Sequence, residues 1–306
     1  LKGLTRKNMQ KDQSSNHIFM IEPQEFFSNP QTAGSNHYQK DDDISRDQIL
    51  KLAINEFRDF RDILVNHGVY ITTFKGDKGC PDHIFPNWFT TFSDKTMQIF
   101  PMKAENRRLE KNQNMIDRLA RSYAISADLS FHENDNTFLE STSSMVFDRV
   151  NDIAYIALSP RANKELAEQW CMDNNFEPII FETTSHSGEP IYHTDVLMYV
   201  GTSLIGICLD VINEEYRALV EQKVCQHHEI LKIEKDQLLS FCGNSLEVKN
   251  KEDHLYLVMS GTAKNALNDE QIQIIHRHYK GIISSDIRTI EKYGGGSARC
   301  MLSELF

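Results

Sequence analysis

The sequence has no long apolar run and only six cysteines among its 306 residues. Its longest apolar stretches fall well short of the ~20 residues that a membrane-spanning helix needs, so no membrane segment is expected. The cysteines show no repeated spacing, and a chain of this length can bury a core without disulfides. We therefore expect reduced thiols and a cytoplasmic protein. Residues 1–15 lack the apolar segment of a signal peptide, although a start at Leu1 rather than Met leaves an upstream leader open.

Basic residues are too few to balance the acidic ones. The chain has 33 Lys and Arg against 44 Asp and Glu, which gives a net charge of −11. It lacks the basic footprint of a nucleic-acid binder and the charge that anionic membranes attract. A hydrophobic content of 40% and a charged content of 25% are ordinary for a globular protein. These values exclude disordered, collagen-like and coiled-coil chains, and we expect neither a nucleic-acid nor a membrane partner.

Short apolar segments outnumber amphipathic helical segments by about two to one. Helical periodicity covers residues 43–67, 106–123, 163–174, 214–227 and 269–278. Strand-like runs include residues 17–21, 69–73, 153–158, 179–183, 197–201, 204–209 and 255–259. This ratio does not fit the one-to-one alternation of a doubly wound parallel sheet, and it favours an α/β fold of repeated β-β-α-β units. No low-complexity linker divides the chain, so we expect a polar N-terminal extension over residues 1–15 and a single domain over residues 16–306.

A glycine-rich loop with a cysteine lies near the C-terminus. Residues 293–301 read YGGGSARCM, and consecutive glycines permit positive φ and close approach of the backbone to a ligand. Such a loop can present the Cys300 nucleophile to a small substrate. Taken alone, the segment is more typical of a turn followed by a buried structural cysteine. A dinucleotide-binding loop is excluded because no βαβ unit follows it.

Two other segments carry acid–base groups. Residues 191–198, taken as extended, would direct His193 and Asp195 to one face, where they can act as an acid–base and an anchor for a cation. The alternative is a histidine–aspartate pair that satisfies itself at a strand end. Glu140 precedes four hydroxyl residues and a strand, and its carboxylate can orient a histidine or hold a guanidinium. The alternative there is an ordinary turn.

The segment of residues 80–89 mixes aromatic and polar side chains, including Trp88, one of only two tryptophans. Aromatic walls with a few placed polar groups are typical of a small-molecule pocket, and a buried loop is the alternative. Cys225, His227 and His228 lie on a helical pattern without a second ligand pair at zinc-finger spacing, so no metal site is expected.

Eight segments occur together in a characteristic order: NPQTAGSNHYQ, PDHIFPNWFTTF, IFPMKAENRRLE, LESTSSMVFDR, ALSPRA, PIYHTDVLMYVG, FCGNSLEV and GGGSARCMLSE. From about Ile18 to Phe306 the chain resembles the pentein, or guanidino-group-modifying, superfamily. Within it, the chain most resembles the arginine-deiminase-related group of citrulline-utilisation hydrolases, also described as amidinotransferase-like. The resemblance implies a five-bladed, pseudo-fivefold α/β propeller of ββαβ units. It also implies an active site on the central axis and no metal or organic cofactor.

The resemblance also implies roles for the matching residues. Cys300 would be the nucleophilic thiolate and His193 the acid–base. Glu140 would orient His193 and touch the substrate. Asp195 would hold the guanidinium or ureido group; close relatives often have asparagine there, and an aspartate favours a cationic guanidinium.

Three further positions match segments in which relatives bind substrate. Asp82 and Asn87 lie in the aromatic loop, where the spacing of the asparagines differs from the family pattern. Asn244 follows the glycine of FCGNS and would contact the amino-acid end of the substrate. Serines also replace the glycines that relatives tend to have after Glu140, which would narrow the pocket or change the substrate.

The sequence therefore predicts a cysteine-dependent hydrolase that cleaves a guanidino or ureido C–N bond in an arginine- or citrulline-like small molecule, through a covalent cysteine adduct. An amidinotransferase and a non-catalytic pentein binding protein are the alternatives. A papain-type protease is disfavoured, because that class places cysteine near the mature N-terminus with histidine downstream. The expected partner is the small-molecule substrate; the oligomeric state stays open, with a dimer as one option.

Overall fold

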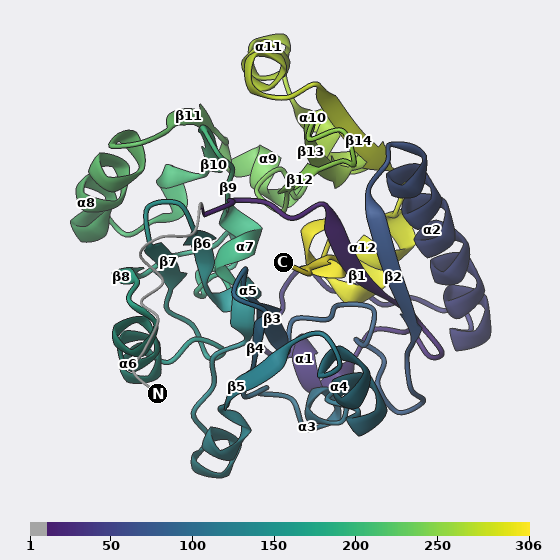
Figure 1. Cartoon of the computed structure of the whole chain (residues 1–306). Coiled ribbons are helices and arrows are strands. Elements are labelled where there is room, and N and C mark those ends of the chain that lie inside the picture. The colour runs from purple at the N-terminus through teal and green to yellow at the C-terminus, as the bar shows by residue number, and fades with distance from the viewer. Residues whose placement is uncertain (1–10) are drawn as a thin grey trace.

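The computed structural model describes residues 11–306, which form five three-stranded blades around a central axis (Figure 1). In sheet order, the blades consist of β15 (Ser303–Glu304), β1 (His17–Glu22) and β2 (Tyr70–Lys75); β3 (Phe89–Thr91), β4 (Thr96–Ile99) and β5 (Ala124–Asp128); β6 (Val146–Asp148), β7 (Ile153–Ala157) and β8 (Glu177–Phe181); β9 (Met198–Val200), β10 (Leu204–Ile207) and β11 (Glu229–Lys232); and β12 (Leu246–Lys249), β13 (Leu255–Ser260) and β14 (Gly281–Ser285).

All five blades share one pairing pattern. The first two strands of each are antiparallel, and the second and third are parallel. A parallel pair needs a crossover connection, which is usually a helix. Each blade is therefore a ββαβ unit, as the strand-to-helix ratio of the sequence predicts.

The crossover helices lie on the outside of the ring, and shorter helices lie nearer the axis (Figure 1). The helices are α1 (Pro30–Ala33), α2 (Arg46–Asn66), α3 (Glu105–Arg108), α4 (Gln113–Leu119), α5 (Ser141–Ser144), α6 (Lys164–Asn174), α7 (Thr194–Leu197), α8 (Glu214–Cys225), α9 (Lys235–Leu239), α10 (Gly261–Ala266), α11 (Asp269–His278) and α12 (Arg288–Gly294), with 3₁₀ turns η2 (Ser130–Asp135), η3 (Leu209–Val211) and η4 (Arg299–Met301). Within residues 11–306, no helix has both the length and the hydrophobicity of a membrane span.

Helix α2 illustrates how the sequence specifies a crossover. The side chain of Ser45 caps its N-terminus by accepting a hydrogen bond from the backbone N–H of Gln48. Its buried residues recur at three- and four-residue steps and form one face: Ile49, Ala53, Phe57, Phe60 and Leu64. This face packs on β2 and β14, so the helix joins the first blade to the fifth.

Four of the predicted helices appear with small shifts at their ends, but the predicted helix over residues 106–123 is wrong. It is divided into α3 and α4. The side chain of Asn112 accepts hydrogen bonds from the backbone N–H groups of Asn114 and Met115 and so starts a new helix. Such local side-chain capping competes with continuation of a helix.

The prediction of an extended chain over residues 191–198 is also wrong in part. His193 has extended dihedral angles, but the next four residues form the single helical turn α7. The turn α5 after Glu140 has the same length and packs against α7. The hydroxyl of Thr194 joins the two turns by donating to the carbonyl of Ser144 at 2.6 Å.

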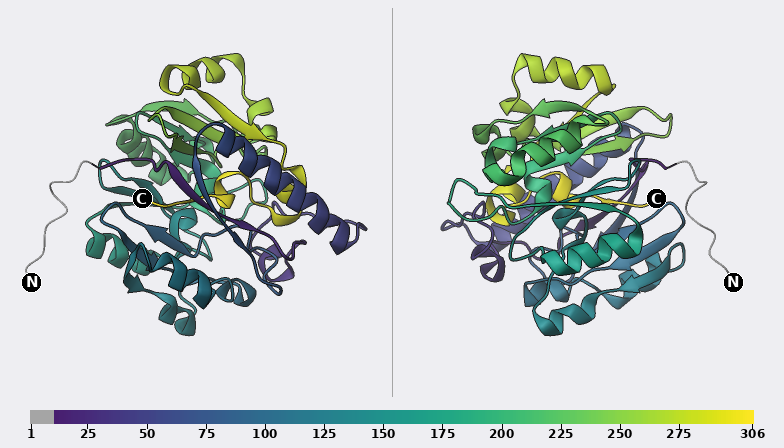
Figure 2. Two further views of the ribbon diagram at one scale, coloured as in Figure 1. Left: turned by 45° about the vertical axis from the view of Figure 1, so that its right-hand side comes forward. Right: turned by 90° about the vertical axis from the view of Figure 1, so that its left-hand side faces the viewer.

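The two ends of the described chain close the ring. Strand β15 pairs antiparallel with β1, with Ile18 opposite Glu304 and Phe19 opposite Ser303. Figure 2 shows the C-terminal segment running through the middle of the molecule to this pairing. Gln13 is buried and donates to the carbonyls of Phe147 and Val200. The packed chain thus begins before residue 16, the start expected from the sequence, and residues 1–10 of the expected extension lie outside the described residues.

Candidate active site

A small cavity lies where the connections between and within the blades converge. It measures about 20 Å³. Its lining residues are Asn36, Asp82, Phe85, Asn87, Arg107, Arg161, Tyr192, His193, Gly294, Gly296 and Cys300. Four of the seven predicted site residues are in this set, and the other three lie directly behind it, in contact with its lining.

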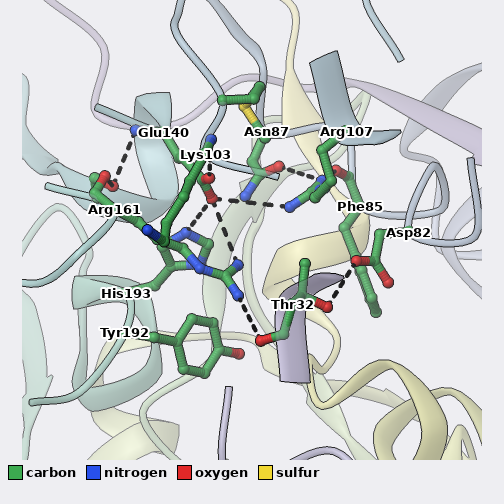
Figure 3. Close-up of polar contacts among 12 residues, drawn as sticks. Thr32, Asp82, Phe85, Asn87, Lys103, Arg107, Glu140, Arg161, Tyr192 and His193 are labelled. Carbon is green, nitrogen blue, oxygen red and sulfur yellow. Dashed lines mark hydrogen bonds and ion pairs between the residues drawn. The ribbon is translucent and has the colours of Figure 1, made fainter. Parts of the chain in front are cut away.

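The side chains of Glu140 and His193 form a buried pair (Figure 3). His193 Nε2 lies 2.7 Å from Glu140 Oε2, and both side chains are almost inaccessible to solvent. The two residues are brought together because each immediately precedes one of the packed turns α5 and α7. Burial lowers the pKa of His193, and the hydrogen bond to Glu140 partly opposes this shift. The imidazole is therefore neutral at neutral pH in the empty site.

Two buried arginines stabilise the charge of Glu140. Arg161 Nη1 lies 3.6 Å and Arg107 Nη1 3.9 Å from Glu140 Oε2, and the backbone N–H of Lys103 donates to Glu140 Oε1 at 3.0 Å (Figure 3). Burial opposes ionisation of Glu140, but Arg161, His193 and Arg107 outweigh it and hold the pKa of this carboxyl well below its usual range. Glu140 is thus an anion throughout the physiological pH range.

Arg107 is fixed by a network of its own. Glu110 binds it through both carboxylate oxygens, at 3.0 and 2.9 Å, and Arg107 also donates to the carbonyl of Phe85 at 2.7 Å and to Asn87 Oδ1 at 2.6 Å. Burial raises the pKa of Glu110 to about 7, although Arg107 opposes this. Asn87 lines the cavity, as expected for a substrate-binding residue, but its carbonyl oxygen is committed to Arg107.

Asp82 presents an unused acceptor to the cavity. Its Oδ2 accepts hydrogen bonds from Asn29 at 2.7 Å and from the hydroxyl of Thr32 at 3.2 Å. Its Oδ1 is buried and has no hydrogen-bond partner among the described residues. An unsatisfied buried acceptor is costly, so its presence at a cavity points to a ligand that donates a hydrogen bond.

The thiol of Cys300 faces the cavity from the 3₁₀ turn η4, next to Asn244 and Asp195. Asn244 Nδ2 lies 3.2 Å and Asp195 Oδ2 3.8 Å from Cys300 Sγ. Burial, followed by the nearby charge of Asp195, raises the pKa of the Cys300 thiol to about 12. The pKa of Asp195 is itself raised by burial, which His193 partly opposes. In the empty site Cys300 is therefore a protonated thiol.

The glycines before Cys300 are needed because the loop packs closely on Phe85. A Cβ atom on Gly294 would lie 2.6 Å from Phe85 Cζ, and one on Gly296 would lie 3.1 Å from it and 3.3 Å from Cys300 Sγ. Gly295 has a φ of 61° and ends helix α12. Phe85 therefore forms the aromatic wall of the cavity, whereas Trp88 is fully buried in the core against Phe89.

Several residues at the cavity carried no individual prediction. Arg161 lies within the conserved-looking motif ALSPRA, and Arg107 stands three residues before Glu110, which is a spacing that allows an ion pair on a helix. The sequence suggests only surface charges or a structural ion pair for Arg107. Tyr192 donates its hydroxyl proton to the carbonyl of Gly295 at 2.6 Å, and its ring packs on the Arg161 guanidinium. Within residues 11–306, no group of three His, Cys, Asp or Glu side chains is placed to hold a metal ion.

Five ββαβ blades around this axial cavity define the fold of the pentein, guanidino-group-modifying hydrolases. The sequence profile of the eukaryotic N,N-dimethylarginine dimethylhydrolase family matches residues 22–306, and the chain belongs to that family. No curated protein shows significant similarity to it.

Solved structures confirm the fold at low sequence identity. An arginine dihydrolase of the ornithine–ammonia cycle in cyanobacteria, ArgZ, has a TM-score of 0.71 and 13% identity over 94% of this chain. The match spans 40% of that protein, and the isolated N-terminal domain of ArgZ is matched over 97% of its length with the same TM-score. A dimethylarginine dimethylaminohydrolase, solved as an adduct with 4-chloro-2-hydroxymethylpyridine, has a TM-score of 0.64 and 17% identity, covering 94% of this chain and 99% of that one.

Proposed function

We propose that the protein is a hydrolase that cleaves a C–N bond of a free, arginine-like guanidino compound through a covalent adduct on Cys300. The observation that carries this proposal is the convergence of three features on one small cavity. These are the Cys300 thiol, the buried His193–Glu140 pair and the unused acceptor of Asp82. Similar ArgZ structures hold arginine-derived species, including one covalently bound to a reaction intermediate, which supports the same chemistry here.

The charges around the cavity favour a cationic group. Asp82 offers a free oxygen, and Asp195 lies beside the thiol with its own pKa raised by burial. A planar guanidinium bound between these carboxylates would add positive charge beside Cys300 and offset the effect of Asp195 on the thiol. A neutral ureido group would leave Asp195 uncompensated, so we propose a guanidino rather than a citrulline-like substrate. The small volume of the cavity favours a free molecule over an arginine within a protein chain.

In the first half-reaction, the bound cation favours the thiolate of Cys300, which attacks the central carbon of the guanidinium. The thiol proton passes to His193, which is neutral in the empty site. His193 then returns this proton to the departing nitrogen as the C–N bond breaks, and an S-alkylthiouronium adduct remains. Glu140, always ionised here, stabilises the transient imidazolium.

In the second half-reaction, water attacks the same carbon of the adduct. His193 takes one proton from the water and returns it to the sulfur as the C–S bond breaks, which restores the thiol. The second proton of the water is lost to solvent as the C=O bond forms, and a neutral ureido product is released. No oxidant or reductant is consumed. A free thiol suits a reducing compartment, and all six cysteines are free in the structure, so we also propose a cytoplasmic location.

The test is a substrate panel followed by mass spectrometry. Purified protein is incubated with arginine, mono- and dimethylated arginine, agmatine and citrulline, with and without an added amine acceptor. We expect citrulline from arginine or from a methylated arginine, together with ammonia or a methylamine. Transfer of the amidino group to the added amine would instead indicate an amidinotransferase, and no product with any compound would reject the proposal.

The environment of Cys300 also predicts how its reactivity depends on pH. Asp195 is a cause of the raised pKa of the thiol, because a neighbouring anion disfavours the thiolate. Replacing Asp195 by asparagine should lower that pKa, so alkylation by iodoacetamide should begin at lower pH. At a fixed pH below the transition, the rate should increase about tenfold for each unit by which the pKa falls. Asp286→Asn, at an exposed helix start, is the control and should leave the profile unchanged.

A further inference from the structure

Asn244 does not lie at the position that the family resemblance of its sequence motif implies. It was expected at the amino-acid end of the substrate, but it is fully buried and is not part of the cavity lining. Its side chain instead contacts the nucleophile three times, and in one of these contacts the thiol donates to Asn244 Oδ1 at 3.5 Å. Nδ2 lies 3.2 Å from Cys300 Sγ, and the backbone N–H of Cys300 approaches Asn244 Oδ1 at 3.4 Å.

The orientation of the Asn244 amide is fixed by a third contact. Nδ2 also donates to the backbone carbonyl of Asp195 at 2.9 Å. If the amide were turned over, its oxygen would face this carbonyl and its NH₂ group would face the N–H of Cys300, which gives two repulsive contacts. The donor end of the amide must therefore point to Sγ.

The local backbone explains how Asn244 comes so close to the thiol. It follows Gly243, where a Cβ atom would lie only 2.4 Å from the carbonyl oxygen of Val196 in α7. The absence of a side chain at Gly243 lets the turn press against α7, and the backbone N–H of Asn244 closes the turn on the carbonyl of Phe241 at 2.9 Å. The turn at Gly243 and Asn244 thus packs directly against both helix α7 and Cys300.

A donor at this position acts differently on the two states of the sulfur. Hydrogen bonds to an ionised acceptor are roughly twice as strong as those between neutral groups. Asn244 therefore stabilises the thiolate more than the thiol, in a site where burial and Asp195 both oppose the thiolate. No cationic side chain is within hydrogen-bond distance of Sγ among the described contacts, so this amide is the main side-chain donor that the sulfur has.

We infer that Asn244 is a further catalytic residue, which donates a hydrogen bond to the Cys300 thiolate as it attacks and does not bind the substrate's amino-acid end. The inference rests on the proposed function in one respect, namely that Cys300 is the nucleophile. The amide also fixes the position of the sulfur through its bond to the Cys300 backbone, so that the same side chain activates and orients the nucleophile.

The test compares Asn244→Ala and the nearly isosteric Asn244→Asp with the unsubstituted protein. Both variants lack the donor, so alkylation of Cys300 by iodoacetamide, followed by mass spectrometry of its peptide, should shift to higher pH. At a fixed pH, we expect the rate of Cys300 alkylation to fall to about one tenth or less. We expect kcat to fall by at least about 10²-fold, with little change in KM. The aspartate variant preserves the shape of the side chain but adds an anion beside the thiol, so its shift to higher pH should be the larger of the two. The alanine variant isolates the loss of the donor, and its melting temperature shows whether it is folded.

Asn250→Ala is the matched control. Asn250 is also a buried asparagine that bridges two segments, binding the carbonyl of His67 and the backbone N–H of His254, but it is remote from the thiol. The Asn250→Ala substitution should lower the melting temperature of the protein without shifting the pH profile of Cys300 alkylation. An unchanged profile in folded Asn244→Ala would overturn the inference, as would a rise in KM at constant kcat. Alkylation of Cys300 needs no substrate. It therefore tests the role of Asn244 even if the panel yields no product and the proposed function is rejected.

Discussion

Replacing Cys300 by alanine should abolish turnover, with a loss of at least about 10⁴-fold in kcat, because no other group in the cavity can form the covalent adduct. Substrate binding should persist, since the carboxylates and arginines that line or adjoin the cavity are unchanged. Calorimetric titration of the variant with the substrate found in the panel measures binding, and product formation measures turnover.

Cys225→Ala is the control for this experiment. Cys225 is exposed at the end of α8 and takes no part in the cavity, so its replacement should leave kcat unchanged. Turnover by Cys300→Ala above a few per cent of the unsubstituted rate would contradict a covalent mechanism. Loss of activity in both variants would indicate general damage to the fold.

Replacing Glu140 by glutamine should damage both catalysis and stability. The substitution removes the one negative charge that contacts Arg161 among residues 11–306, and it leaves two buried guanidinium groups close to His193. Breaking a buried ion pair from one side costs about 3–5 kcal/mol of unfolding free energy. Loss of the group that supports the imidazolium should also lower kcat by about 10²- to 10⁴-fold.

The stability effect should depend on pH in a defined direction. The pKa of Glu140 is lower in the folded protein than in the unfolded chain, so its contribution is fully present above its ordinary pKa and is lost as the pH falls. Urea unfolding of both proteins should therefore show a large difference at neutral pH that shrinks in acid. The control is Glu168→Gln, whose carboxylate is half exposed beside Lys164 and should matter little. A difference that grows in acid would refute the assigned charge state.

The sequence is sufficient to predict the repeating unit of the fold and to single out Cys300, His193 and Glu140, which the fold brings together at one cavity. Each of these belongs to a motif whose residues are close in sequence, and the ratio of strands to helices is a local property. It was not sufficient for Arg107 and Arg161. Arginine is almost always exposed, and only the folded chain shows that these two converge on one buried carboxylate.

Side-chain direction is a second property that the sequence leaves open. The family resemblance places Asn244 at the substrate, but the close approach of Gly243 to α7 brings its amide to Cys300. For residues 80–89 the sequence allows a pocket wall or a buried loop, and the structure contains both. Phe85 faces the cavity and Trp88 lies in the core.

The closure of the ring by β15 has a consequence for biosynthesis. Strand β1 is made before nearly all of the described chain, whereas its partner β15 and the nearby Cys300 are made after nearly all of it. Until β15 has been made, one edge of β1 stays unpaired, which is a hazard for aggregation. During this interval the nascent chain carries His193 and Glu140 without the Cys300 thiol. A product truncated before residue 300 would therefore lack both the pairing that closes the ring and the proposed nucleophile.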